Sequence, residues 1–215
     1  MDFISFQSDP RKTPFAPDFK YILCETYAID VDFNHISKLI LEKEKEILAT
    51  TKAGGDGYTN LGPNSLTSRF RHFNVFKWQD KELSKLLECL KQEHTFFLDT
   101  LKIPNRKLWM QCWANVMRRG EKIAPHIHSA KPDCYLGGHV MVQCSNTNTV
   151  YINPVNQIND PEEYISINEV GKITLFQNCI PHYTTKHEDN TERISIAFDL
   201  FVHNDNGNKN LIKFN

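Results

Sequence analysis

One stretch of the sequence decides the interpretation of the rest: residues 113–144, WANVMRRGEKIAPHIHSAKPDCYLGGHVMVQC. It places His126 and His128 at alternate positions, and a run of strand-forming residues that contains His139 follows. Residues two apart on a strand project from the same face, so His126 and His128 can reach one metal ion if Ile127 turns away. The stretch therefore predicts part of a metal site carried on β structure.

A second stretch, residues 176–200 (FQNCIPHYTTKHEDNTERISIAFDL), supplies the rest of the expected site. Its His182 follows a predicted strand and turn and provides a third imidazole. Three imidazoles occupy one face of an octahedral ion and leave open positions, as in non-haem iron sites, which normally use two histidines and one carboxylate. Arg193 follows on a strand, where its planar guanidinium suits a carboxylate ligand. Ser195, two residues on, adds a hydroxyl donor from the same face.

Composition indicates one soluble globular domain over residues 1–215, mainly β in an α+β arrangement. The net charge of -1 argues against electrostatically driven binding of nucleic acid. No apolar run approaches the ~20 residues of a membrane helix, and the N-terminus does not resemble a secretory signal. We expect a cytoplasmic protein without membrane contact, for which a homodimer is compatible with the sequence. The six scattered cysteines are expected to be free, mostly buried thiols.

Helix signals come first along the chain and strand signals later. Residues 32–51 predict an amphipathic helix capped by Asp32 or Asn34, and Asp80 caps a second helix with a leucine stripe. Residues 1–20 predict an irregular arm, 21–30 a strand, 53–65 a mobile loop near a site entrance, and 66–78 a strand. Short strands follow from Lys107. This order predicts a jelly-roll core with two helices packed on one face.

The motifs resemble a known family, the iron- and 2-oxoglutarate-dependent oxygenases, and are most similar to its small prolyl-hydroxylase-like members from bacteria and phages. The resemblance rests on WANV (113–116), GEKIAPHIH (120–128), GGHVMV (137–142), GKITLFQNCIPH (171–182) and ERISIAFD (192–199). It implies a double-stranded β-helix and a dioxygenase that uses Fe(II), 2-oxoglutarate and O2. It assigns iron binding to His126 and His182, and the far carboxylate of 2-oxoglutarate to Arg193 and Ser195.

The sequence departs from the family pattern at His128, where Asp or Glu is usual. His128 itself can be the third ligand, which gives a three-histidine site. Alternatively, Asp133 can supply a carboxylate, or the motif can begin at His128 with Ala130 in the acid position, which in related halogenases leaves space for chloride. The last option is a two-histidine site completed by water.

Several further residues are candidates for the pocket. His139 can face the cosubstrate or the metal, although a hydrogen-bonded core histidine fits the pattern equally well. Trp113 and Asn115 alternate on one predicted strand, and Tyr151 and Asn153 on another, so either pair can line the pocket. Two other histidines are expected outside the site: His94 in a structural position and His187 in an exposed turn.

The resemblance implies hydroxylation of an unactivated C–H bond, with decarboxylation of 2-oxoglutarate to succinate. A peptidyl proline or another protein side chain is the implied substrate, with a small molecule or a nucleotide as the other options. Two alternatives are a three-histidine thiol dioxygenase without 2-oxoglutarate, and a non-catalytic cupin-like module that binds a metal or ligand.

Overall fold

The computed structural model of the protein describes residues 1–155, 162–204 and 209–215. The helices in these ranges are α1 (Phe33–Thr50) and α2 (Lys81–Leu101), with two short 3-10 helices, η1 (Thr67–Arg69) and η2 (Val75–Lys77). The strands are β1 (Asp2–Gln7), β2 (Lys20–Tyr27), β3 (Trp109–Met117), β4 (Cys134–Gln143), β5 (Asn148–Ile152), β6 (Glu163–Ile167), β7 (Lys172–Phe176), β8 (His182–Thr184), β9 (Arg193–Phe201) and β10 (Ile212–Lys213).

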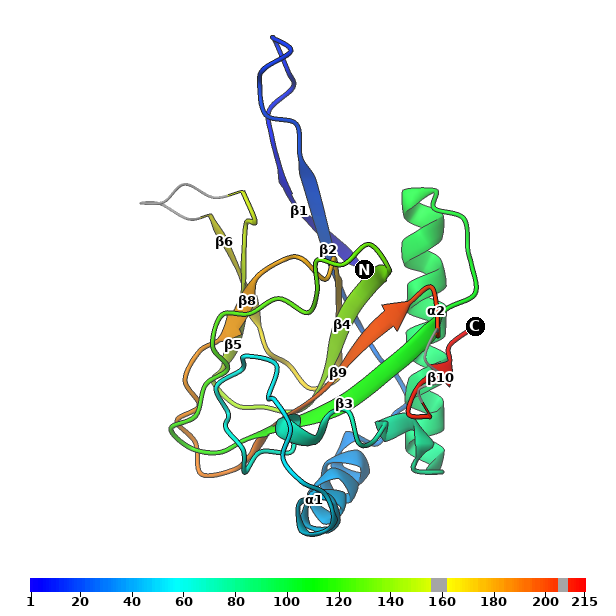
Figure 1. Ribbon diagram of the computed structural model, residues 1–215, viewed down its shortest axis with the longest axis vertical. Coiled ribbons are helices and arrows are strands. Elements are labelled where there is room, and N and C mark those ends of the chain that lie inside the picture. The colour runs from blue at the N-terminus through cyan, green and yellow to red at the C-terminus, as the bar shows by residue number, and fades with distance from the viewer. Residues whose placement is uncertain (156–161, 205–208) are drawn as a thin grey trace.

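The strands form two antiparallel sheets, and both helices lie against the larger one (Figure 1). The larger sheet has the order β1-β2-β7-β4-β9-β3-β10, and the smaller sheet has the order β6-β5-β8. Neighbouring strands are mostly distant in sequence, as in a jelly roll. The predicted fold class, a double-stranded β-helix with two helices on one face, is confirmed.

Alternation along the central strand β9 separates the core from the opposite face of the sheet. Ile194, Ile196 and Phe198 belong to the hydrophobic cluster that the helices cover, whereas Arg193 and Ser195 line a pocket on the other side. Successive side chains on a strand point to opposite faces, so one strand supplies both the core and the pocket.

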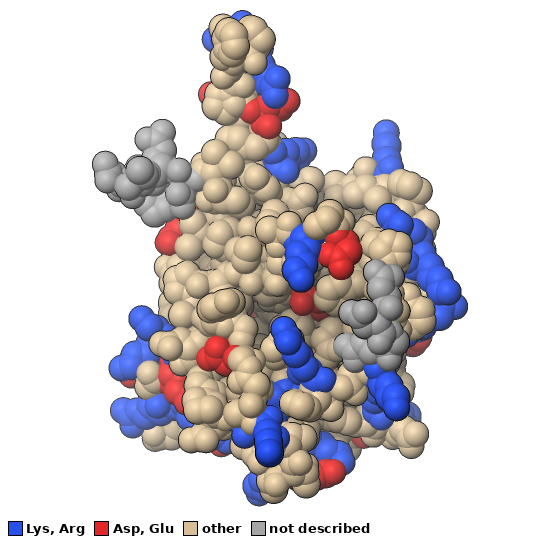
Figure 2. Space-filling model, in the orientation of Figure 1, with Lys and Arg blue, Asp and Glu red and all other residues tan. Residues whose placement is uncertain are grey.

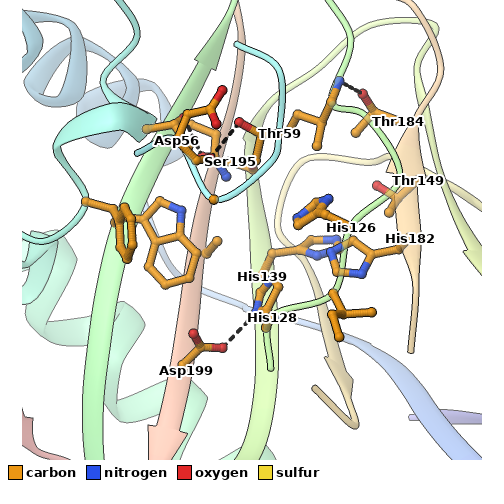
Figure 3. A pocket seen from close by; sticks show the side chains of 18 of the residues that line it. Asp56, Thr59, His126, His128, His139, Thr149, His182, Thr184, Ser195 and Asp199 are labelled. Atoms are coloured by element: carbon orange, nitrogen blue, oxygen red, sulfur yellow. Dashed lines mark hydrogen bonds and ion pairs between the residues drawn. The ribbon is translucent and has the colours of Figure 1, made fainter. Parts of the chain in front are cut away.

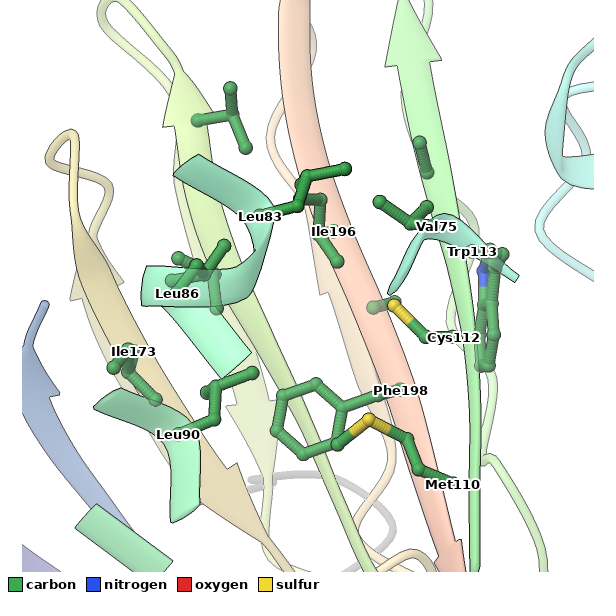
Figure 4. Close-up of a cluster of buried hydrophobic side chains, with 14 of the residues drawn as sticks. Val75, Leu83, Leu86, Leu90, Met110, Cys112, Trp113, Ile173, Ile196 and Phe198 are labelled. Carbon is green, nitrogen blue, oxygen red and sulfur yellow. The ribbon is translucent and has the colours of Figure 1, made fainter. Parts of the chain in front are cut away.

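The helices begin and pack as their sequences predict. The Asp32 side chain accepts a hydrogen bond from the backbone of His35 at the start of α1, and Asp80 accepts from Glu82 and Leu83 at the start of α2. These bonds satisfy amide groups that a helix start leaves without partners. Figure 4 shows the leucines of α2 against the sheet; they are Leu83, Leu86 and Leu90. Over the described residues, neither helix is long and apolar enough to cross a membrane.

Two predictions for the first half of the chain are wrong. Residues 66–78 hold η1 and η2 instead of a strand. The Asn74 side chain accepts from Phe76 N and donates to the Met110 carbonyl, and such local side-chain bonds favour turns over sheet pairing. Residues 1–20 are not wholly irregular, because β1 pairs with β2 and buries Phe6. The two strands form an arm that projects from the body (Figure 2).

Two predictions about burial also need correction. His187 is fully buried instead of lying in an exposed turn; its backbone pairs with Gly120 and Glu121, and its ring bonds the Thr191 carbonyl.

All six cysteines, which lie within the described ranges, are free as predicted, but only Cys24 and Cys112 are buried. His94 is buried in α2, as expected of a structural residue, and its ring meets Phe214 edge-on.

Gly138 on β4 offers a test of the packing between the sheet and the core. A Cβ there would clash with the Phe198 ring and lie 2.8 Å from the Thr174 carbonyl oxygen. We expect Gly138→Ala to lower the free energy of unfolding by about 1–3 kcal/mol, because the ring and the strand cannot both move away cheaply. Gly55→Ala is the control, since nothing lies within 4 Å of its Cβ. Urea denaturation measures both; equal stability of the two variants would contradict the packing argument.

Candidate active site

The segment that carries His126 and His128 is held against β8 by backbone hydrogen bonds. His126 and His182 exchange N–H to carbonyl bonds of 3.1 and 3.0 Å, as an isolated antiparallel bridge. His128 N donates to the Asn178 carbonyl at 3.0 Å. The two histidines therefore follow the alternation that the sequence predicted, although the segment is a single bridge and not a strand of its own.

The three imidazoles of His126, His128 and His182 converge, with one ring nitrogen from each lying within 4.8 Å of the others. Each Nδ1 already faces an oxygen: the Ala124 carbonyl for His126 at 2.9 Å, Asp199 for His128 at 2.7 Å, and the Ile180 carbonyl for His182 at 3.1 Å. Because a carbonyl or carboxylate accepts, each Nδ1 carries the proton. All three Nε2 lone pairs are then available to a metal ion.

Burial keeps the rings of His126 and His182 neutral, which is the form that binds metal. Desolvation, followed by repulsion from His128, lowers the pKa of His126 to about 4. Desolvation also holds the pKa of His182 well below its usual value, and the neighbouring histidines lower it further. At neutral pH these rings are lone-pair donors and not cations.

Arg193 is fully buried in the same pocket, at 2% exposure. One terminal nitrogen lies 3.4 Å from Ser195 Oγ and the other 3.5 Å from Thr149 Oγ1. Its Nε has no hydrogen-bond partner among the described residues. Burial lowers the pKa of Arg193 to about 10, so the guanidinium remains charged at neutral pH. Among the described residues, the guanidinium nitrogens meet the hydroxyls of Ser195 and Thr149 and the thioether sulfurs of Met117 and Met141. Burying a cation among such neighbours is costly, and an anion in the pocket would offset that cost.

The pocket lies between the two sheets, and the loop after α1 forms part of its lining (Figure 3). Phe70 and Trp113 form an aromatic wall with ring centroids 5.5 Å apart. The loop contributes Asp56 and Thr59, and the Thr59 carbonyl accepts from Ala124 N at 2.8 Å. Residues 53–65, the loop that the sequence placed near a site entrance, therefore contact the segment that carries His126 and His128.

The structure gathers most of the predicted site residues and leaves a few outside. The pocket is lined by His126, His128, His139, His182, Arg193, Ser195, Trp113 and Asn115, among others. Tyr151 does not line it but packs behind it, stacked on His139 at a centroid distance of 6.3 Å. Asp133 and Ala130 are exposed and lie outside the lining, as does Asn153. Asp133 is therefore not brought to the histidines.

Sequence reasoning missed Asp199, Asn178 and Thr149. Asp199 bonds His128, Asn178 bonds both Asp199 and the backbone of His128, and Thr149 bonds Arg193. A signal existed for Asp199, because alternation in RISIAFD places it on the same strand face as Arg193 and Ser195. Nothing comparable in the sequence points to Asn178, which lies in a turn.

A family model described as "Putative 2OG-Fe(II) oxygenase" matches residues 111–199, from β3 to β9. This range contains the three converging histidines and Arg193. The match covers 89 of the 215 residues and indicates a 2OG-Fe(II) oxygenase family enzyme. The cofactors of the family are Fe(II) and 2-oxoglutarate. The residues of this oxygenase suit both, since one ring nitrogen from each of three histidines converges beside a buried guanidinium whose Nε has no hydrogen-bond partner among the described residues. No curated protein matches the sequence.

Solved structures share the fold of this oxygenase at low sequence identity. A prolyl-4-hydroxylase from Pseudomonas putida is 10% identical, with a TM-score of 0.54 over 84% of this chain and 92% of that one. A prolyl hydroxylase from Trichoplax adhaerens, in complex with a hypoxia inducible factor peptide fragment, is 14% identical, with a TM-score of 0.53 over 83% of each chain. The non-heme alpha ketoglutarate dependent epimerase SnoN, from nogalamycin biosynthesis, is 8% identical, with a TM-score of 0.54 over 83% and 76%. At these identities the likeness shows the fold alone.

The buried neutral histidines make the metal-free oxygenase sensitive to acid. Desolvation lowers the pKa of His139 in the folded protein from its ordinary value of 6.5 to about 3. Between these two pH values the His139 ring is protonated in the unfolded state but neutral in the folded state. The stability that His139 contributes is present above pH 6.5 and is lost as pH falls toward 3. At pH 5 that loss is about 2 kcal/mol for this one ring.

Urea denaturation at pH 7.5 and pH 5, with a chelator present, measures this loss. We expect His139→Gln to lose less stability than the native protein over that interval. His35→Gln is the control, because Asp80 raises the pKa of His35, so its removal cannot reduce the loss in acid. An identical loss in the native protein and His139→Gln would contradict the effect.

Proposed function

We propose that this oxygenase binds Fe(II) through His126, His128 and His182, and holds the far carboxylate of 2-oxoglutarate with Arg193 and Ser195. We further propose that it hydroxylates an unactivated C–H bond, and that a peptidyl proline is the substrate class. His139 lines the same pocket and is assigned to the cosubstrate side.

The observation that carries the proposal is that three converging histidines and the buried Arg193 line the same pocket. One ring nitrogen from each of the three histidines lies within reach of a single metal ion, and Arg193 Nε has no hydrogen-bond partner among the described residues. A dicarboxylic oxo acid that chelates a metal at one end and meets an arginine at the other satisfies both. Bidentate charge-assisted hydrogen bonds make guanidinium a strong partner for carboxylate.

Each residue then has a definite task. The three histidines would hold the metal. Arg193 and the hydroxyls of Ser195 and Thr149 fix the orientation of the far carboxylate. Metal and oxo acid together supply the oxidative chemistry, in which O2 and decarboxylation to succinate are coupled to C–H oxidation. Phe70 and Trp113 exclude water from one side of the pocket and offer an apolar surface to a substrate.

The substrate class is supported by the shape of the pocket and by the structural neighbours. The aromatic wall of Phe70 and Trp113, together with half-exposed Ile127, suits an apolar ring such as pyrrolidine. Two of the neighbours are prolyl hydroxylases, one of them bound to a peptide fragment. SnoN is an epimerase with the same fold, so the fold does not select the substrate.

A three-histidine thiol dioxygenase is the second candidate, because the converging set contains no carboxylate. Such an enzyme binds no 2-oxoglutarate and gives Arg193 no dicarboxylate to hold. Titration with the cosubstrate therefore separates the two candidates.

The first experiment is an anaerobic titration of the Fe(II)-loaded protein with 2-oxoglutarate, followed by visible charge-transfer absorption. We expect a saturating band in the native protein. Arg193→Met should raise the apparent Kd on the order of 100-fold or more, because the far carboxylate loses a buried charged partner.

Arg119→Met is the control, because Arg119 is exposed and bonds Asn190 at the surface; it should titrate like the native protein. Arg193→Met should remain folded, since methionine fills similar space without an unpaired buried charge. Bound iron without any band in the native protein would rule out the oxygenase proposal and favour the thiol dioxygenase or a non-catalytic module.

Succinate formation tests the substrate class. We expect a proline-containing peptide to stimulate succinate production several-fold over the protein alone, and the same peptide with alanine in place of proline to have no effect. Mass spectrometry should find one added oxygen in the peptide. Equal stimulation by the two peptides would contradict the prolyl assignment and leave the oxygenase chemistry standing.

A further inference from the structure

Asp199 meets one of the three converging histidines through a short charged hydrogen bond. His128 Nδ1–H donates to Asp199 Oδ1 at 2.7 Å (Figure 3). The side chain of His128 is 5% exposed and that of Asp199 is 14% exposed. The other two histidines direct Nδ1 to backbone carbonyls. His128 is therefore distinguished within this set by a carboxylate partner.

Asn178 fixes both members of this pair. Its backbone carbonyl accepts from His128 N at 3.0 Å and from Ser129 N at 3.2 Å. Its side-chain Nδ2 donates to Asp199 Oδ1 at 3.2 Å. One turn residue thus positions the backbone of His128 and also the oxygen that receives its ring proton.

Because Gly137 has no side chain, it leaves space for the side chains of His128, Asn178 and Asp199 to meet. It lies opposite Asp199 in the pairing of β4 with β9. A Cβ at position 137 would lie 2.8 Å from Asn178 Oδ1 and 3.1 Å from His128 Nδ1. The contact between Asp199 and His128 therefore depends on a glycine on the neighbouring strand.

We infer that Asp199 is a positioning residue for the metal centre, acting through His128. Its carboxylate holds the His128 ring with Nε2 toward the ion, and it returns a negative charge to a centre whose proposed ligands are all neutral. In a site of two histidines and one carboxylate, a ligand carries that charge. Here Asp199 carries it, one hydrogen bond away from the His128 ring. The inference rests on the proposed ligation by His126, His128 and His182.

The physical effect of such a partner is well defined. A carboxylate that accepts from the far nitrogen of a ligating imidazole fixes its tautomer and makes the near nitrogen a stronger donor. Loss of such a partner typically costs about 10–100-fold in metal affinity. Because Asp199 accepts from a proposed ligand and is not a member of the converging set of histidines, its substitution should weaken binding without removing a ligand.

Metal affinity in the absence of 2-oxoglutarate tests the inference. The probe is Co(II), titrated in competition with a chromophoric chelator, with the visible Co(II) absorption recorded at saturation. We expect Asp199→Asn, which keeps an acceptor oxygen but loses the charge, to bind Co(II) about 10-fold more weakly. Asp199→Ala should bind on the order of 100-fold more weakly and shift the Co(II) absorption, because the His128 ring is then free to rotate.

Asp133→Asn is the matched control, since it removes one carboxylate from the exposed turn before β4; it should bind Co(II) like the native protein. Circular dichroism of the metal-free variants checks that all are folded. Native affinity and an unchanged absorption spectrum in Asp199→Asn would overturn the role of Asp199.

The same titrations separate this inference from the proposed function. Normal Co(II) binding by the native protein, combined with no charge-transfer band on adding 2-oxoglutarate to the Fe(II) form, would refute the oxygenase proposal alone. No Co(II) binding by the native protein would refute the histidine ligation, and the role of Asp199 with it.

Discussion

The pairing of β9 on both of its edges is the constraint on which the rest of the structure depends. β3 pairs with it from Trp109↔Phe201 to Met117↔Arg193, and β4 pairs along its other edge. With both edges fixed, the strand cannot slip, and a slip of one residue would turn Arg193 toward the helices. The apolar residues of β9 remain in the core, and its polar residues remain in the pocket.

The histidines depend on a second and much smaller pairing. His126 and His182 are joined by a single backbone bridge between segments that are far apart in the chain. The bridge is reinforced nearby, because Ile123 N donates to Thr184 Oγ1 at 2.9 Å. Closing a loop of this length costs entropy, and the pairing of the strands on either side of the bridge offsets that cost.

The sequence predicted those parts of the protein that local chemistry determines. Capping by Asp32 and Asp80 and the leucine stripe of α2 identified the helices, and alternation identified the strands that carry Arg193 and Ser195. The turns at 66–78 were missed because Phe70, Phe73 and Val75 mimic a strand, while Asn74 directs the backbone elsewhere. His187 has charged neighbours in sequence, but long-range backbone pairing with Gly120 and Glu121 accompanies its burial. The partnership of Asp199 with His128 depends on long-range register, which no local pattern contains.

The acceptors behind the three imidazoles differ in how they can change during evolution. His126 and His182 direct Nδ1 to main-chain carbonyls, which every amino acid possesses, so substitution of Ala124 or Ile180 preserves these tautomers. The tautomer of His128 depends on a side chain at position 199. Residue replacement can therefore adjust the electronic character of one imidazole while the other two stay constant. Among these three acceptors, only residue 199 acts through its side chain, so substitution there can change the donor strength of His128 and leave all three histidines in place.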